Sequence, residues 1–251
     1  MHTSTIVLDE AALERGLLAL ESARSWSPRV ISRLEAALRS ASDEALFRVN
    51  PRRFAAEQKI PEAEAIDLFL HATRVGLFEL AWHMVCEFCG HVVESLRELA
   101  GVHPHYHCNF CQSENELALD DTLHVTFTPA PALRRLRYHQ PDSLEVLDYY
   151  LNYHFARGVH FADGSTLEAA GQAITRHMAW VEPGEVVDLE VEIEAGRLSL
   201  ADLRQPAQLA AFLADTNPAS ELLQVQLRQD GFHPTQHEVC LLYTSDAADD
   251  T

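Results

Sequence analysis

Four cysteines stand in two pairs with the spacing C-x2-C: Cys86 and Cys89 in C-E-F-C, then Cys108 and Cys111 in C-N-F-C. Eighteen residues separate the pairs, a spacing typical of zinc sites in which two tight turns present four thiolates to one ion. Backbone N–H groups inside each turn can point at the sulfurs and offset their charge. Gly90 follows the first pair, and glycine takes the positive φ that such a turn often needs. The pattern predicts one structural Zn²⁺ per chain.

Two other interpretations of these residues were weighed. Two redox dithiols are disfavoured, because a redox C-x-x-C motif comes singly beside a βαβ pattern. His103, His105 and His107 precede the second pair, and imidazole is a common zinc ligand. Since four cysteines already fill a tetrahedral shell, we expect the histidines to lie beside the site or in a loop. An enzyme site among these histidines and the aromatic residues of 139–160 remains a weaker alternative.

Charge is distributed unevenly along the chain of 251 residues, whose formal net charge is −19. Residues 141–251 contain 5 Lys/Arg and 19 Asp/Glu, whereas residues 1–60 contain 9 and 8. The acidic part should repel nucleic acid and anionic membranes. Nothing approaches the roughly twenty apolar residues of a membrane span, and the N-terminus lacks the pattern of a signal peptide. Together with free cysteines, this predicts a cytoplasmic location without membrane association.

Helices are expected first. Apolar spacing predicts amphipathic helices over residues 8–20 and 31–46, the second with Ser27 as N-cap and Pro28 in its first turn. Asn50 should cap a helix that Pro51 opens, and residues 63–74 form another helix before Gly76. The residues expected as the buried stripe of this last helix are Ala65, Ile66, Leu68, Phe69 and Leu70.

A strand beginning near Leu77 completes the order of a winged helix-turn-helix unit. That order makes DNA binding a candidate role. The recognition helix of such a unit needs hydrogen-bond donors and positive charge at its start. The corresponding positions here carry the acidic residues Glu62, Glu64 and Asp67. We therefore favour a packing module and keep DNA binding as the alternative.

The middle of the chain is expected to be a zinc ribbon. Residues 91–99 are a connecting segment, and the alternating residues 117–127 form a β-hairpin that turns at Asp120 and Asp121. The basic residues Arg29, Arg33 and Arg39, and later Arg134, Arg135 and Arg137, are expected to be solvated. Residues 143–157 fit a helix or a pair of strands, and residues 167–178 predict a helix.

Antiparallel strands should follow. Residues 187–194 alternate apolar and acidic side chains, which predicts a strand with one wet face and not a calcium site. Shorter strands are expected at residues 198–200 and 222–227. The segment from Cys240 resembles translated sequencing-adapter readthrough, so we expect residues 240–251 to be non-native and the β region before them to be truncated.

The predicted class is therefore α+β, in three regions before that tail. They are a helical, winged-helix-like region over 1–82, a four-cysteine zinc ribbon over 83–130 and an α+β region with acidic strands over 131–239.

The order of several segments resembles a bacterial domain of unknown function, DUF5939, found N-terminal to class III adenylate/guanylate cyclase catalytic domains. The segments are L-F-R-V-N-P-R-R-F-A-A-E, F-L-H-A-T-R-V-G-L-F-E-L-A-W, the two C-x2-C pairs and L-H-V-T-F-T-P. The resemblance spans residues 40–239 and implies a regulatory or sensory region whose partner is a cyclase catalytic domain downstream.

The chain itself offers no paired metal-binding aspartates beside a nucleotide site, so we expect no cyclase activity from it. No other arrangement of catalytic residues was found. A homodimer is left open, and nucleic acid is not an expected partner.

Overall fold

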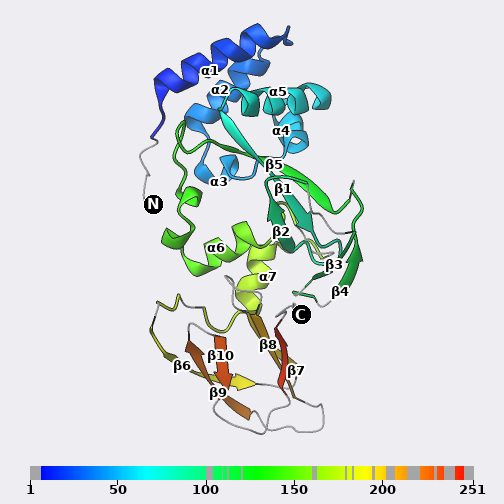
Figure 1. Cartoon of the computed structure of the whole chain (residues 1–251), viewed down its shortest axis with the longest axis vertical. Coiled ribbons are helices and arrows are strands. Elements are labelled where there is room, and N and C mark those ends of the chain that lie inside the picture. Colours follow the sequence, from blue (N-terminus) through cyan, green and yellow to red (C-terminus); the bar gives the residue numbers. More distant parts are fainter. Residues whose placement is uncertain are drawn as a thin grey trace, which may run out of the picture. The chain divides into compact units, whose positions relative to one another are not determined.

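The computed structural model describes residues 7–99, 104–108, 110–111, 113–119, 121–159, 163–178, 180–182, 184–193, 196–201, 207–213, 221–228, 231–234 and 241–245. The chain divides into two compact units, residues 1–159 and 160–251 (Figure 1). Both contain α-helix and antiparallel sheet, which confirms the α+β class. The finer boundaries near residues 82 and 130 stay predictions.

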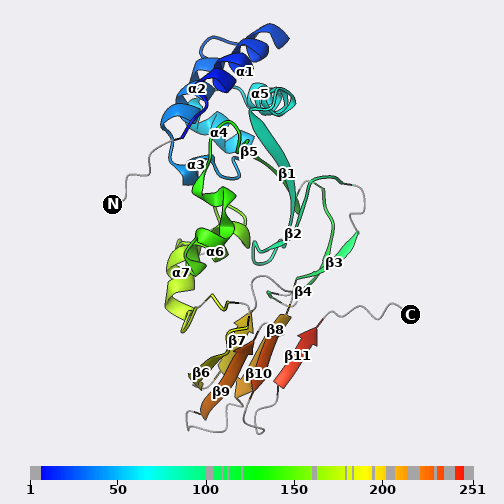
Figure 2. The ribbon, with the colours of Figure 1, turned by 60° about the vertical axis from the view of Figure 1, so that its left-hand side comes forward.

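Helices gather at one end of the long strands of the first unit (Figures 1 and 2). They are α1 (Glu10–Ala23), α2 (Val30–Ser40), α3 (Asp43–Leu46), α4 (Pro51–Gln58) and α5 (Glu62–Arg74). Asn50 caps α4 as predicted, its side chain accepting the N–H of Arg52 at 2.9 Å. The predicted start of α2 is wrong: its N-cap is Arg29, with φ 70°, and no side chain caps it. The backbone N–H of Ser27 instead donates to the buried Glu64 carboxylate at 2.6 Å.

The core of this unit forms where α5 packs on α1, α4 and the sheet. Phe69, 1% exposed, places its ring about 5 Å from those of Phe54, Phe78 and Phe127. Ala65, Leu68 and Ala72 are fully buried beside it. Ile66 and Leu70 are exposed, which corrects their predicted place in the stripe. They lie one residue beyond Ala65 and Phe69, and one residue turns a helical side chain by about 100°.

A three-stranded antiparallel sheet in the order β2-β1-β5 supports this core. Its strands are β1 (Phe78–Val85), β2 (Val92–Leu96) and β5 (Leu123–Pro129), and a separate hairpin joins β3 (His105–Cys108) to β4 (Ser113–Glu116). The strand β1 confirms the prediction at Leu77, whereas β2 occupies residues expected to be a connection. The predicted hairpin over 117–127 is wrong, because β5 pairs with β1 through Phe127 opposite Leu80. Phe127 is buried in the core, whereas Leu119, which the predicted hairpin would place on the opposite strand, is exposed.

After β5, residues 130–159 pack back against the N-terminal helices. After the short 3₁₀ turns η1 (Arg137–His139) and η2 (Pro141–Ser143) comes α6 (Val146–Tyr153), which settles residues 143–157 as largely helical. Arg134 is only 1% exposed and corrects the expectation of a solvated side chain. Its guanidinium donates to the carbonyl oxygens of Leu38 at 2.7 Å and Ala41 at 2.6 Å, and pairs with Asp43 at 3.1 Å.

The second unit contains α7 (Leu167–Ile174) and the strands β6 (Val187–Ile193), β7 (Gly196–Ala201), β8 (Ala207–Leu213), β9 (Glu221–Arg228), β10 (Gly231–Pro234) and β11 (Leu241–Ser245). They form two antiparallel sheets, β10-β9-β6 and β11-β8-β7.

Three of these strands, β6, β7 and β9, were predicted, and α7 ends before the predicted Met178. Asp188 and Glu190 are exposed, whereas Val187 and Leu189 are partly buried, as the alternation predicts. Strand β11 lies in the segment expected to be non-native, and that origin stays a prediction.

Within the described residues, no helix combines the length and hydropathy needed to cross a bilayer.

We expect Arg134→Met to lower the free energy of unfolding by about 3 kcal/mol, because two carbonyl oxygens and a carboxylate would lose a buried charged donor. Urea unfolding followed by circular dichroism measures this. Arg135→Met is the matched control: its side chain is exposed, so the change should stay within about 0.5 kcal/mol. Equal effects of the two substitutions would contradict the buried role of Arg134.

Candidate metal centre

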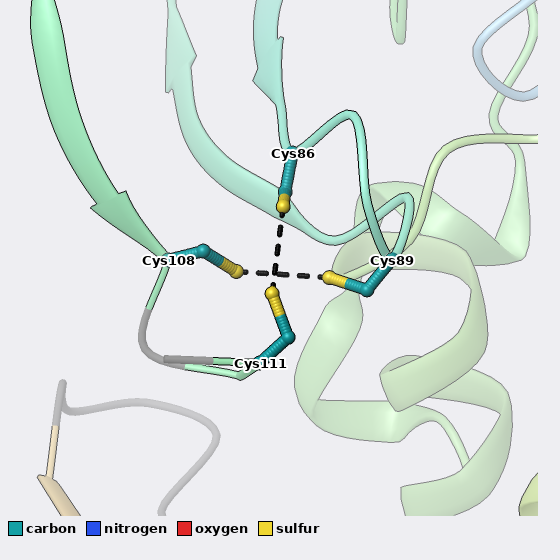
Figure 3. A group of neighbouring side chains, drawn as sticks. All are labelled: Cys86, Cys89, Cys108 and Cys111. Carbon is teal, nitrogen blue, oxygen red and sulfur yellow. Dashed lines mark hydrogen bonds between the residues drawn. The ribbon is translucent and has the colours of Figure 1, made fainter. Parts of the chain in front are cut away.

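The four cysteines of the two C-x2-C pairs meet at the end of the β1–β2 sheet (Figure 3). Cys86 directly follows β1, Cys89 lies in the turn to β2, Cys108 ends β3, and Cys111 lies in the connection to β4. Their Sγ atoms all lie within 4.8 Å of one another. The Cys86–Cys111 and Cys89–Cys108 sulfur distances are 3.6 and 3.7 Å. A tetrahedron with Zn–S bonds of about 2.3 Å needs sulfurs about 3.8 Å apart, so the cluster is compatible with a metal ion such as zinc.

The first turn has the backbone that the sequence predicts. Gly90 has φ +72°, and its N–H donates to the carbonyl oxygen of Cys86 at 2.9 Å. The N–H of Cys86 in turn donates to the carbonyl oxygen of His91, also at 2.9 Å. Any larger residue at 90 would need a strained φ, and its Cβ would overlap Val159. Gly90 therefore sets the geometry that brings Cys86 and Cys89 to one side.

Polar groups around the sulfurs reduce the cost of gathering negative charge here. The backbone of Phe110 and Cys111 and the side chain of His91 act to lower the pKa of Cys108, and the backbone of His91 acts to lower the pKa of Cys89. The Cys89 thiol also donates to Cys108, which lowers the pKa of Cys108 to about 3 and raises that of Cys89. Burial raises the pKa of Cys111. Cys108 is thus the cysteine whose thiolate the surroundings favour, and gathering four thiolates requires a bound positive ion.

Three residues that the sequence analysis did not single out also belong to this site. The His91 ring stacks on Phe110 at 5.5 Å between centroids. Ser113 Oγ lies 3.0 Å from Cys111 Sγ, and the Cys86 thiol donates to the buried Asn115 side chain at 3.5 Å. The sequence signal for Ser113 and Asn115 is that polar residues alternate on the strand after the second cysteine pair. Alone, that pattern is also typical of any solvated strand.

The histidines before the second pair do not join the cluster within the described residues. His105 is exposed on β3, and His107 Nδ1 lies 2.8 Å from Glu114 Oε1 across the β3–β4 hairpin. His103 lies outside the described residues.

Aromatic residues of the 139–160 region include a packed group. Tyr153 stacks on Tyr149, with ring centroids 4.9 Å apart, and also contacts Phe47. Burial raises the pKa of Tyr153 to about 12. A tyrosine that remains protonated at neutral pH suits packing better than proton transfer.

A family model described as a family of unknown function, DUF5939, matches residues 14–242. The chain belongs to the DUF5939 family. The match includes both cysteine pairs and thus supports the DUF5939 resemblance found in the sequence. Searches among curated proteins and among solved structures gave no match.

We expect Cys108→Ser to lose bound zinc and become sensitive to protease around residues 86–116, because three remaining thiolates leave an open shell. Metal analysis by mass spectrometry and limited trypsin digestion measure the two effects. Cys240→Ser is the matched control and should retain zinc, since Cys240 lies outside both C-x2-C pairs. A Cys108→Ser protein with its zinc and protease resistance intact would show that these sulfurs do not hold the ion.

Proposed function

We propose that this chain is a non-catalytic regulatory or sensory region that acts on a class III adenylate/guanylate cyclase catalytic domain, and that a structural zinc ion bound by a ribbon-like pair of turns stabilises it. The observation that carries the proposal is the convergence of four cysteine sulfurs within 4.8 Å. Four thiolates complete a tetrahedral shell and leave no coordination position for substrate or a reactive water. Such a site stabilises the fold, and the region would then act by contacting a partner domain.

The cyclase partner is inferred from the family resemblance. Membership of DUF5939 supports the cyclase partner through the sequence segments quoted above, which resemble regions that precede cyclase domains. The charge of the second half adds a constraint on partners: with 19 acidic and 5 basic residues in 141–251, a partner surface should be neutral or basic where it meets that part.

Fusion to a catalytic domain tests the regulatory role. We expect the isolated chain to bind about one zinc ion and to make no cyclic nucleotide from ATP or GTP. Joined in front of a class III catalytic domain, it should change cyclic-nucleotide production several-fold relative to the free catalytic domain. The change should disappear in the Cys108→Ser fusion and persist in the Cys240→Ser fusion. Product formation by the chain alone, or fusions indistinguishable from the free catalytic domain, would contradict the proposal.

DNA binding is the alternative, and one structural feature favours it. The helices α4 and α5 pack together and are followed by the antiparallel pair β1–β2, the order of a winged helix-turn-helix. Against it, the first turn of α5 carries Glu62 and Glu64, and Glu62 pairs with Arg52 at 2.9 Å.

A gel shift with mixed-sequence duplex DNA at low salt decides between the two functions. DNA binding predicts a shift that weakens steeply as salt rises. The regulatory proposal predicts none.

A further inference from the structure

A cavity with an unusual charge lies in the first unit, and its lining includes none of the four cysteines. It opens between the start of α4, the strands β1, β2 and β5, and the residues that follow α6. Its polar lining comprises Arg48, Asn50, His83, His124, Thr126 and Arg157, and the lining contains no carboxylate. Its volume is about 30 Å³. That space admits about two water molecules or the small charged group of a ligand.

Arg48 is the most buried charged residue of the lining. It is 8% exposed, and its Nη1 donates to the carbonyl oxygens of Asn152 and Tyr153, both at 3.0 Å. These carbonyls belong to the C-terminal end of α6, whose partial negative charge offsets part of the guanidinium charge. Nη2 makes a long contact of 3.4 Å with Ser95 Oγ, and the guanidinium also lies over the rings of Phe47 and Tyr153, 5.3 and 5.2 Å from their centroids. Among the described residues, no carboxylate forms an ion pair with Arg48.

Arg157 supplies a second positive charge, and the histidines do not neutralise the pair. Its Nη1 donates to the carbonyl oxygens of Glu44 and Phe47, and Nη2 lies 3.4 Å from the largely exposed Glu44 carboxylate. Burial, with the nearby charge of Arg157, lowers the pKa of Arg48 to about 10. His83 accepts or donates at both ring nitrogens, 2.8 Å from Ser95 Oγ and Thr126 Oγ1. Burial and the Arg48 charge lower its pKa to about 3, so it is neutral.

A buried guanidinium without a carboxylate partner is costly, and polar carbonyls offset only part of that cost. An anion in the cavity would neutralise it and would meet arginine donors in a partly desolvated space, where charge-assisted hydrogen bonds are strong. We propose that this cavity binds the oxyanion group of a small ligand, with phosphate as the fitting chemistry and with Arg48 and Arg157 as its charged donors. The proposal does not depend on the regulatory function.

Calorimetric titration with inorganic phosphate, at an ionic strength held constant with chloride, tests the site. We expect saturable binding at one site per chain. Arg157→Gln should weaken it roughly tenfold, as expected for losing one charged hydrogen-bond donor. Arg135→Gln removes the same charge from an exposed side chain outside the lining, and should leave the affinity unchanged.

A second pair of variants keeps the test independent of whether Arg157→Gln folds. His124 is half-buried in the lining, whereas His105 is exposed on β3. His124→Glu should abolish phosphate binding by adding a negative charge to the cavity, whereas His105→Glu should not. A parallel titration with adenosine monophosphate distinguishes a phosphate ester from free phosphate as the ligand. Comparable affinity indicates a phosphate ester whose organic part stays outside the cavity, and loss of binding indicates free phosphate. No saturable binding by the unaltered chain, or equal weakening by lining and control variants, would overturn the proposal.

Discussion

The structure around the cysteines depends on one electrostatic constraint: four sulfurs within 4.8 Å cannot all be thiolates without a cation among them. A divalent ion would leave the group with a net charge of about −2, and the polar backbone of the two turns together with the His91 side chain favours negative charge on Cys89 and Cys108. The constraint reaches beyond the ligands. His91 also pairs with Phe155 as a β-bridge, and the N–H of Ala156 donates to the carbonyl oxygen of Gly90 at 2.8 Å. The turn that holds Cys86 and Cys89 therefore also fixes the residues after α6.

Buried arginine side chains also connect distant parts of the chain elsewhere in the first unit. Arg134, Arg48 and Arg157 each donate to backbone carbonyls about a hundred residues away in sequence. Each joins the helical N-terminal half to residues 130–157. A guanidinium suits this role because its several donors have fixed directions and can satisfy two carbonyls at once. The helices and the returning segment are thus held by buried polar contacts in addition to the apolar core.

Those long-range contacts explain where prediction from sequence succeeded and where it failed. Local signals gave α4, with Asn50 and Pro51 at its start, and the strand β1 after Gly76, because caps, proline and glycine act on their immediate neighbours. The convergence of the four cysteines was also predictable, since the spacing alone limits how the pairs can meet. Arg134 was misjudged because its partners, Leu38, Ala41 and Asp43, are set by tertiary structure. Pairing failed for the same reason: the partner of β5 is β1, which no local alternation identifies.

Residues that line the charged cavity are adjacent to residues of the metal centre, so the properties of the two sites should be linked. Val85 precedes Cys86, Val92 follows His91, and both line the cavity. Phe155 lies in the lining and also packs its ring edge on His91, with centroids 5.5 Å apart. If a bound metal fixes the first cysteine turn, it fixes these three side chains and lowers the ordering cost of filling the cavity with an anion. Linkage is reciprocal, so an anion bound beside Arg48 would favour the metal-bound turn to the same extent. A region built this way would bind the anion more tightly when its metal is in place.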